Sequence, residues 1–229
     1  MAVTSFPKTP AASRRIMTAA DLPHLLSALG DIPPERLMLD PLPGTATEAD
    51  VVRLVDGDDK VLCELVDGTL VEKPVGFIEA YLATSVATKL ANFAQEHDLG
   101  IVVGADAMLR MTGGNVRLPD VSFVAWDDLP GGKIPSEAVG KFAATLVVEV
   151  LSPSNSKAEM RRKRQEYFTS GTKLVWEFDL KLRSVSVFTS PETVRTLGEQ
   201  ETLDGGDVLP GFALSLASLF AQLDRMLKD

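Results

Sequence analysis

Residues 143–180 read AATLVVEVLSPSNSKAEMRRKRQEYFTSGTKLVWEFDL, and this stretch decides the fold. Within it, residues 146–151 are apolar except for Glu149 and lack the alternation of a half-buried strand. Such a run predicts a strand that is covered on both faces and lies centrally in a sheet. An acid inside it is buried and charged unless it is paired or coordinated, which favours a functional role for Glu149.

The rest of this stretch predicts a helix and then two strands. Ser156, with Glu159 three residues later, has the pattern of a capping box, and Gly171 marks the expected helix end. The segments KLVWEFDL (173–180) and SVSVFTS (184–190) predict two strands joined by a turn. The order strand, helix, strand is typical of an α/β fold.

Upstream segments extend this prediction. VLCELVDGTLVEKP (61–74) predicts a hairpin, because Asp67-Gly68 suits a turn in which both central residues need positive φ. Apolar residues recur at three- and four-residue spacing over 77–96, which predicts a long helix. GIVVGADAMLRM (100–111) predicts one strand with a bulge at Gly104. Together with a final amphipathic helix, these elements predict a central mixed β-sheet flanked by helices.

Length and composition favour one domain. The chain has 229 residues, 45% of them hydrophobic and 24% charged, which is ordinary globular composition. Residues 1–16 are predicted to be a flexible tail and 17–229 a single domain. No apolar run approaches the ~18 residues that span a bilayer, and the N-terminus lacks a secretory signal. We therefore expect no membrane association and a cytoplasmic location, with the lone Cys63 as a buried thiol.

Charge restricts the chemistry. A net charge of −9 argues against coating of nucleic acid by bulk attraction, and two histidines leave little for a histidine-based triad or zinc site. The densest basic patch spans 157–173, where Arg161, Arg162 and Arg164 are the predicted contacts to a nucleic-acid backbone. A solvated basic helix face is the alternative explanation.

Two acids stand at matching places on two predicted strands. Asp120 follows Pro119 at the start of the strand in RLPDVSFVAW (117–126), and Glu149 lies near the end of the central strand. If the two strands are neighbours, both carboxylates project toward the same end of the sheet. Two hard oxygen donors suit Mg²⁺ or Mn²⁺. A turn or capping role is the alternative for Asp120.

A lysine on the predicted helix adds a positive charge. Lys163 would stabilise negative charge at an attacked phosphate or help to position the water nucleophile. Tyr167, four residues later, shares its helical face and either supports the site or packs.

Several motifs, in order, carry a resemblance to a known family. LPDVSFVAW (118–126), LVVEVLSPSN (146–155), the K-x-x-x-Y of Lys163 and Tyr167, and G-x-x-L-V-W-E-x-D (171–179) closely resemble the Uma-two family of bacterial proteins. That family is assigned to the restriction-endonuclease-like PD-(D/E)XK nuclease superfamily. The likeness covers roughly residues 17–220.

The resemblance implies roles for single residues. Pro119 and Asp120 match the PD, and Glu149 matches the acid of the (D/E)XK element. Leu151 stands where the pattern has lysine, which implies that Lys163 on the following helix takes that role.

Two further acids match acidic or polar positions that precede the core in the family. Glu79 is implied as an additional metal ligand, and Glu72 as a supporting residue. The resemblance also implies a restriction-endonuclease-like α/β core, Mg²⁺-dependent phosphodiester hydrolysis and frequent dimerisation.

The sequence thus favours a metal-dependent endonuclease acting on DNA, working as a homodimer in which pairing supplies a second basic face. The alternatives are a non-catalytic nuclease-fold binding or regulatory protein and a small-molecule phosphohydrolase. An active nuclease predicts that Asp120, Glu149 and Lys163 converge at the bottom of an open groove. A closed pocket favours a small substrate, and divergent side chains favour a binding protein.

Overall fold

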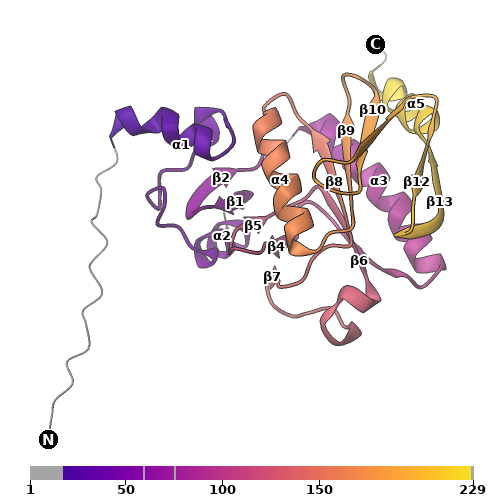
Figure 1. Cartoon of the computed structure of the whole chain (residues 1–229), viewed down its shortest axis with the longest axis horizontal. Coiled ribbons are helices and arrows are strands. Elements are labelled where there is room, and N and C mark those ends of the chain that lie inside the picture. The colour runs from indigo at the N-terminus through magenta and orange to yellow at the C-terminus, as the bar shows by residue number, and fades with distance from the viewer. Residues whose placement is uncertain (1–17, 59, 75, 228–229) are drawn as a thin grey trace, which may run out of the picture.

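The computed structural model describes residues 18–58, 60–74 and 76–227, and the predicted flexible tail at 1–16 lies outside them. Figure 1 shows two groups of strands with helix α4 (Lys157–Ser170) between them. None of the helices in the described part of the chain is long and apolar enough to cross a membrane.

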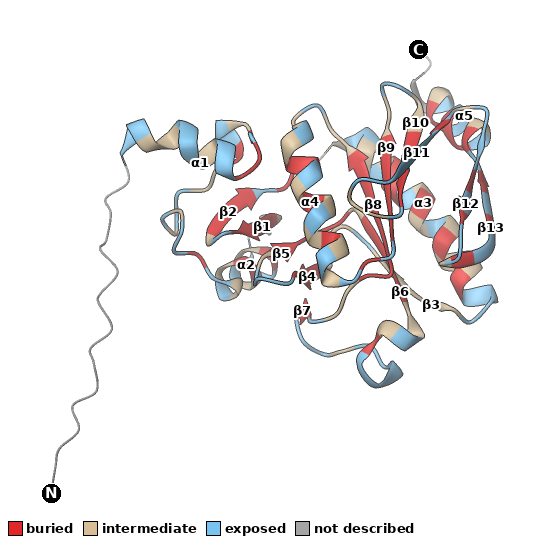
Figure 2. Ribbon diagram, in the orientation of Figure 1, coloured by how far each residue is buried: buried red, intermediate tan, exposed pale blue. Residues whose placement is uncertain are grey.

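The larger sheet has six strands and confirms the predicted central mixed sheet. In spatial order its strands are β11 (Val194–Gly198), β10 (Ser184–Phe188), β9 (Leu174–Asp179), β8 (Leu146–Leu151), β6 (Val121–Ala125) and β3 (Gly100–Val103). Strands β8 and β9 run parallel, and the other neighbours are antiparallel. The non-alternating run β8 lies between β6 and β9 and is buried along nearly its whole length (Figure 2).

Helices cover both faces of this sheet. Helix α3 (Phe77–Glu96) packs Leu82, Val86 and Leu90 into the main core on one face. The hairpin β12 (Thr202–Gly205) and β13 (Leu209–Ser215) and helix α5 (Leu216–Leu227) complete that side. On the other face α4 buries Tyr167 against the sheet. Each large apolar side chain buried in these layers contributes about 1.5–3 kcal/mol.

A second sheet has five strands. In spatial order these are β2 (Thr69–Glu72), β1 (Cys63–Val66), β5 (Val116–Arg117), β4 (Met108–Arg110) and β7 (Val139–Gly140). Helix α2 (Glu48–Val55) packs Val51 and Val55 against it, and Cys63 is fully buried there as predicted. The short elements are η1 (Ala19–Asp21), α1 (Leu22–Ala28), η2 (Pro34–Arg36), η3 (Trp126–Asp128) and η4 (Pro130–Gly132).

One strand prediction was wrong. Residues 100–111 form two strands in different sheets, because β3 pairs with β6 while β4 pairs with β5 and β7. Gly104 lies at the crossing, where its carbonyl accepts a bond from Ala107 N–H at 3.1 Å. Two short strands that belong to different sheets show the same hydrophobic pattern as one strand with a bulge. The sequence pattern therefore could not distinguish these two arrangements.

The turn and cap signals were more reliable. Asp67 and Gly68 have φ values of 49° and 70° and close the β1–β2 hairpin. Ser156 accepts a bond from Glu159 N–H at 2.9 Å, and α4 ends at Gly171 with φ 111°. The second half of the predicted capping box is not used: the Glu159 carboxylate instead takes two bonds from Arg36, at 3.0 and 2.8 Å. This exchange fastens the N-terminal segment to α4.

Candidate functional site

The pairing of β6 with β8 brings the two predicted acids together. Val121 pairs with Val148 in an antiparallel register, so one residue further along Asp120 lies opposite Glu149. Asp120 Oδ2 accepts a bond from Val150 N–H at 2.7 Å. Both carboxylates therefore lie at the same end of the sheet, as the sequence predicted.

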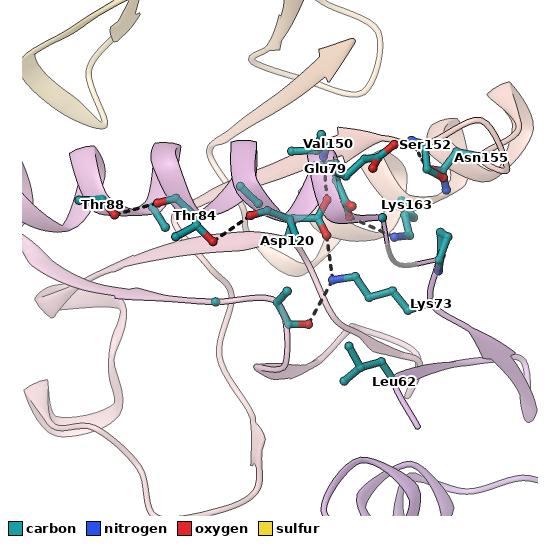
Figure 3. A pocket seen from close by; sticks show the side chains of 18 residues that line it. Leu62, Lys73, Glu79, Thr84, Thr88, Asp120, Val150, Ser152, Asn155 and Lys163 are labelled. Atoms are coloured by element: carbon teal, nitrogen blue, oxygen red, sulfur yellow. Dashed lines mark hydrogen bonds and ion pairs between the residues drawn. The ribbon is translucent and has the colours of Figure 1, made fainter. Parts of the chain in front are cut away.

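These acids lie in a pocket of about 340 Å³ between α3 and the segment that follows β2. Asp120, Glu149 and Lys163 all line it, and Glu79 lines it from α3. In Figure 3, Asp120 lies between the α3 residues Thr84 and Glu79 on one side and Lys73 on the other. The three residues predicted to be catalytic thus converge on one pocket.

Lys163 joins the two sheets. Its ammonium lies 3.2 Å from Glu149 Oε1 on β8 and 3.0 Å from Glu64 Oε1 on β1, and its side chain is only 3% exposed. Tyr167 O–H donates to the same Glu149 oxygen at 2.5 Å. An ammonium has three N–H groups, and no third acceptor for Lys163 occurs among the residues that the structure describes. By this count one N–H group of Lys163 has no described protein acceptor, and Lys163 lines the pocket.

Glu64 was not predicted as a site residue, yet it is the most tightly held acid here. It is 1% exposed, and its Oε2 lies 2.8 Å from Arg117 Nη1. Leu118 N–H donates to its Oε1 at 3.2 Å. The sequence held a signal for it: like Glu149, Glu64 interrupts an otherwise apolar run, CELV (63–66).

The pKa values of the two acids beside Lys163 are shifted in opposite directions. Burial opposes the charge of Glu64, but Lys163 and Arg117 outweigh it and lower its pKa to about 2. Burial raises the pKa of Glu149 to about 7; Lys163 offsets part of this, while Asp120 and Glu64 add to it. Burial lowers the pKa of Lys163, and the two acids more than reverse this, so its pKa is raised. Lys163 therefore keeps its proton at neutral pH, where burial favours the uncharged form of Glu149.

Lys73 is a second lysine at the site that sequence reasoning missed. Its ammonium lies 2.9 Å from Asp120 Oδ1 and donates to the carbonyls of Leu118 at 2.7 Å and Ala105 at 3.1 Å. These three acceptors use all three of its N–H groups. No pattern in the sequence distinguishes Lys73, because its partners come from the crossing between the sheets.

The other predicted ligands fit less fully. Glu79 lines the pocket, but the described residues contain no group of three or more His, Cys, Asp or Glu side chains that could hold a metal ion. Glu72 is exposed on β2, and it is not one of the residues that line the pocket. Its role as a supporting residue, and that of Glu79 as a ligand, stay predictions.

The three predicted DNA-contacting arginines do not form one patch. Arg162 binds Asp67 at 2.7 Å and Glu166 at 2.8 Å, toward the β1–β2 turn. Arg164 lies on the other side of α4, bound to Glu177 at 2.7 Å, and lines a second pocket. Arg161 is exposed. Consecutive helical residues differ by about 100° in direction, so a run of arginines divides between faces.

The fold defined by these elements is nuclease-like. It matches a crystal structure described as "a putative nuclease belonging to DUF820" from Anabaena variabilis, with a TM-score of 0.64 and 17% identity. The match covers 71% of this chain and 91% of that one. At this identity the likeness establishes the fold alone.

The family follows from the sequence match. The model of the Uma2 family, described as "Putative restriction endonuclease", matches residues 50–217. This chain belongs to that family, which confirms the resemblance of its motifs. No curated protein matches the chain.

Proposed function

We propose that this protein is a metal-dependent endonuclease that hydrolyses phosphodiester bonds of DNA in the pocket at Asp120 and Glu149. One observation carries the proposal: the two carboxylates lie opposite each other across β6 and β8, with the Lys163 ammonium 3.2 Å from Glu149, in one pocket. Membership of a restriction-endonuclease-like family supports the same chemistry.

The donor set fits a divalent cation. Mg²⁺ is commonly held by one or two carboxylates, with water and substrate phosphate completing its shell. Asp120 and Glu149 supply those carboxylates, and Glu79 is the proposed third ligand from α3. When bound, Mg²⁺ or Mn²⁺ supplies Lewis-acid stabilisation of the phosphate and a lowered pKa for bound water.

Hydrolysis joins a water oxygen to phosphorus and breaks the bond from phosphorus to one sugar oxygen, which gains a proton. The remaining N–H of Lys163 donates to a phosphate oxygen as negative charge accumulates there. Tyr167 fixes the Glu149 carboxylate, and Val150 N–H with Lys73 fixes that of Asp120. Lys163 thus takes the role that the family pattern gives to a lysine at the position of Leu151.

A small-molecule phosphohydrolase is the second candidate. The pocket volume, about 340 Å³, is at the lower end for small-ligand sites, roughly 300–1,000 Å³. The convergence of Asp120, Glu149 and Lys163 favours either enzyme over a non-catalytic binding protein.

The proposal is tested by titrating Mg²⁺ and Mn²⁺ into the wild type and into Asp120→Asn and Glu149→Gln variants by calorimetry, followed by DNA cleavage assays. We expect both changes to abolish metal binding and cleavage. Glu192→Gln, an exposed acid outside the pocket, serves as the matched control and keeps both. Cleavage that persists in both acid variants, or a wild type inactive on DNA with either metal, contradicts the proposal.

A homodimer is also part of this proposal, because a chain of net charge −9 gains a second basic face by pairing with itself. Light scattering should then give twice the chain mass of 24.6 kDa. A mass of one chain at micromolar concentration removes this part of the proposal and leaves the chemistry unaffected.

A further inference from the structure

The pocket is a trough that follows α3. Beyond the Glu79 carboxylate, its α3 wall consists of small side chains, and these are Ala80, Ala83, Thr84, Ala87 and Thr88. The Thr84 and Thr88 hydroxyls donate to backbone carbonyls of their own helix at 2.8 Å. Figure 3 shows this wall extending away from Asp120 and Lys163. The part of the wall beyond Glu79 has satisfied polar groups and no cation, which suits a sugar and base more than a phosphate.

The acids lie deep in this trough. Glu149 is 4% exposed, and the Asp120 side chain is 17% exposed. A trough of about 340 Å³ holds about one nucleotide. DNA duplexes are stiff, with a persistence length of about 150 bp, and hold each phosphate beside a paired sugar and base. A nucleotide that brings its phosphate to these acids along the α3 wall places its sugar and base in the trough, which an unpaired nucleotide does more easily.

The trough continues into a larger pocket of about 750 Å³. Glu79, Ser152 and Asn155 line both, so the two are adjoining parts of one groove. Three basic residues line the larger part together with three acids, and these are Lys157, Arg164 and Lys181 with Glu79, Glu177 and Asp179. Arg164 is neutralised by Glu177, but no described carboxylate pairs with the exposed Lys157 or Lys181. A strand leaving the acids would meet these two cations.

An exposed aromatic ring stands at the N-terminal end of α3, next to the lining of the trough but not among the residues that line either part. Phe77, the first residue of α3, is 82% exposed. It lies seven and eleven residues before Thr84 and Thr88, close to two and three helical turns, and so shares their pocket-facing side of α3. Its neighbour Gly76 lines the trough. Aromatic side chains that face solvent beside a nucleic-acid groove stack on unpaired bases.

From these observations we propose that the substrate is unpaired, single-stranded DNA. Phe77 stacks on a base next to the scissile phosphate, and Lys157 and Lys181 contact phosphates further along the strand. The chemistry in this inference rests on the proposed nuclease function. The preference for single strands over duplex DNA rests on the geometry of the groove.

The test measures binding of a fluorescently labelled 15-nucleotide strand and of a hairpin duplex of the same sequence, by anisotropy in EDTA. We expect the wild type to bind the single strand at least about tenfold more tightly than the duplex. Phe77→Ala should weaken single-strand binding about tenfold to a hundredfold, and Phe77→Trp should retain it. Ile134→Ala, an exposed apolar residue outside both parts of the groove, should change nothing.

The two lysines are tested through salt. Each phosphate contact on a single strand contributes about −0.7 to the slope of log affinity against log salt concentration. The double variant Lys157→Ala with Lys181→Ala should therefore bind with a slope smaller in magnitude by about 1.4. An unchanged slope removes the proposed strand path through the second pocket.

Mg²⁺-dependent cleavage of both DNA forms separates the two proposals. Cleavage that prefers duplex and is indifferent to Phe77→Ala overturns this inference while the nuclease function stands. Phe77-dependent binding of single strands without any cleavage supports the ligand and overturns the nuclease function. A wild type that binds neither form, or binds duplex more tightly, overturns this inference.

Discussion

Two lysine–carboxylate pairs lie in one pocket but differ in what surrounds them. Lys73 holds Asp120 at the end of the six-stranded sheet, and its three N–H groups are all taken by protein oxygens. Lys163 lies between Glu149 and Glu64 and uses two of its donors on described residues. Lys73 is therefore suited to hold structure, whereas Lys163 has one N–H group without a described protein acceptor.

The same contrast applies to the acids of the Lys163 cluster. Glu64 has Arg117 as a second cation and keeps its charge, with a pKa of about 2. Glu149 has only a share of Lys163 and the Tyr167 hydroxyl, and its pKa is about 7. The acid with the less complete charge compensation is the one that faces the pocket. A cation that binds there would supply the charge compensation that the protein itself does not give to Glu149.

The largest expected effect is on the DNA cleavage rate, and it distinguishes Lys163 from Lys73. Lys163→Met should lower the DNA cleavage rate by about 10²–10³-fold, because a donor aimed at developing charge is lost. Glu149 can take up a proton when Lys163 is lost, so no unpaired buried charge remains there and the variant should fold. Circular dichroism can verify the folding. Lys133→Met, an exposed cation outside the pocket, is the control and should retain the rate. A Lys163→Met enzyme with near-normal turnover would falsify the assignment of this lysine to the reaction.

The next prediction concerns stability and Lys73. Lys73→Met leaves the Asp120 carboxylate and two carbonyls without their partner, and breaking a buried pair costs about 3 kcal/mol. We expect this loss in urea unfolding, with a smaller decrease in turnover than for Lys163→Met. Lys173→Met removes an exposed pair with Asp128 and should cost at most about 1 kcal/mol. Equal stability of the two variants would contradict a stabilising role for the buried pair of Lys73 with Asp120.

A third prediction contrasts Glu149 with Glu64 through pH. The pKa of Glu149 rises from 4.5 to about 7 on folding, so its charge reduces stability as pH increases from about 4.5 to 7. Glu149→Gln should therefore stabilise the fold by up to about 3 kcal/mol at pH 8 and by little at pH 4.

The charge of Glu64 has the opposite effect on stability. Its pKa falls from 4.5 to about 2, so its contribution is complete above pH 4.5 and is lost as pH falls toward 2. Glu64→Gln should lower the free energy of unfolding at pH 8 by about 3 kcal/mol. Urea unfolding of both variants across pH 3–9 measures the contrast; curves of the same sign would contradict it.

The smallest expected effect belongs to Tyr167. Tyr167→Phe removes the hydroxyl that donates to Glu149 and should cost about 1–2 kcal/mol of stability. The lost bond favoured the charged carboxylate, so the pKa of Glu149 should rise further. Calorimetry of Mg²⁺ binding at several pH values should then show its midpoint moved to higher pH. An unmoved midpoint indicates that Tyr167 packs without tuning this acid.

Local signals predicted most of the elements well. The Asp67-Gly68 turn, the apolar periodicity of α3 and the Gly171 stop of α4 each depend on a few neighbouring residues, and each is found. The crossing at Gly104 was missed because it depends on which distant strand each half pairs with. The family match confirms the assignment made from the motifs around Asp120 and Glu149.

The sequence by itself determined the central strand, the buried acid in it and the family of the protein. An acid in an apolar run requires compensation wherever the run is buried, so that conclusion needs no partner to be known. Only the tertiary structure decided which cations compensate which acids. Lys73, Glu64 and Arg117 meet the site across two sheets, and such contacts depend on the crossing of the chain between them. Burial is encoded locally, but charge pairing is set by the fold as a whole.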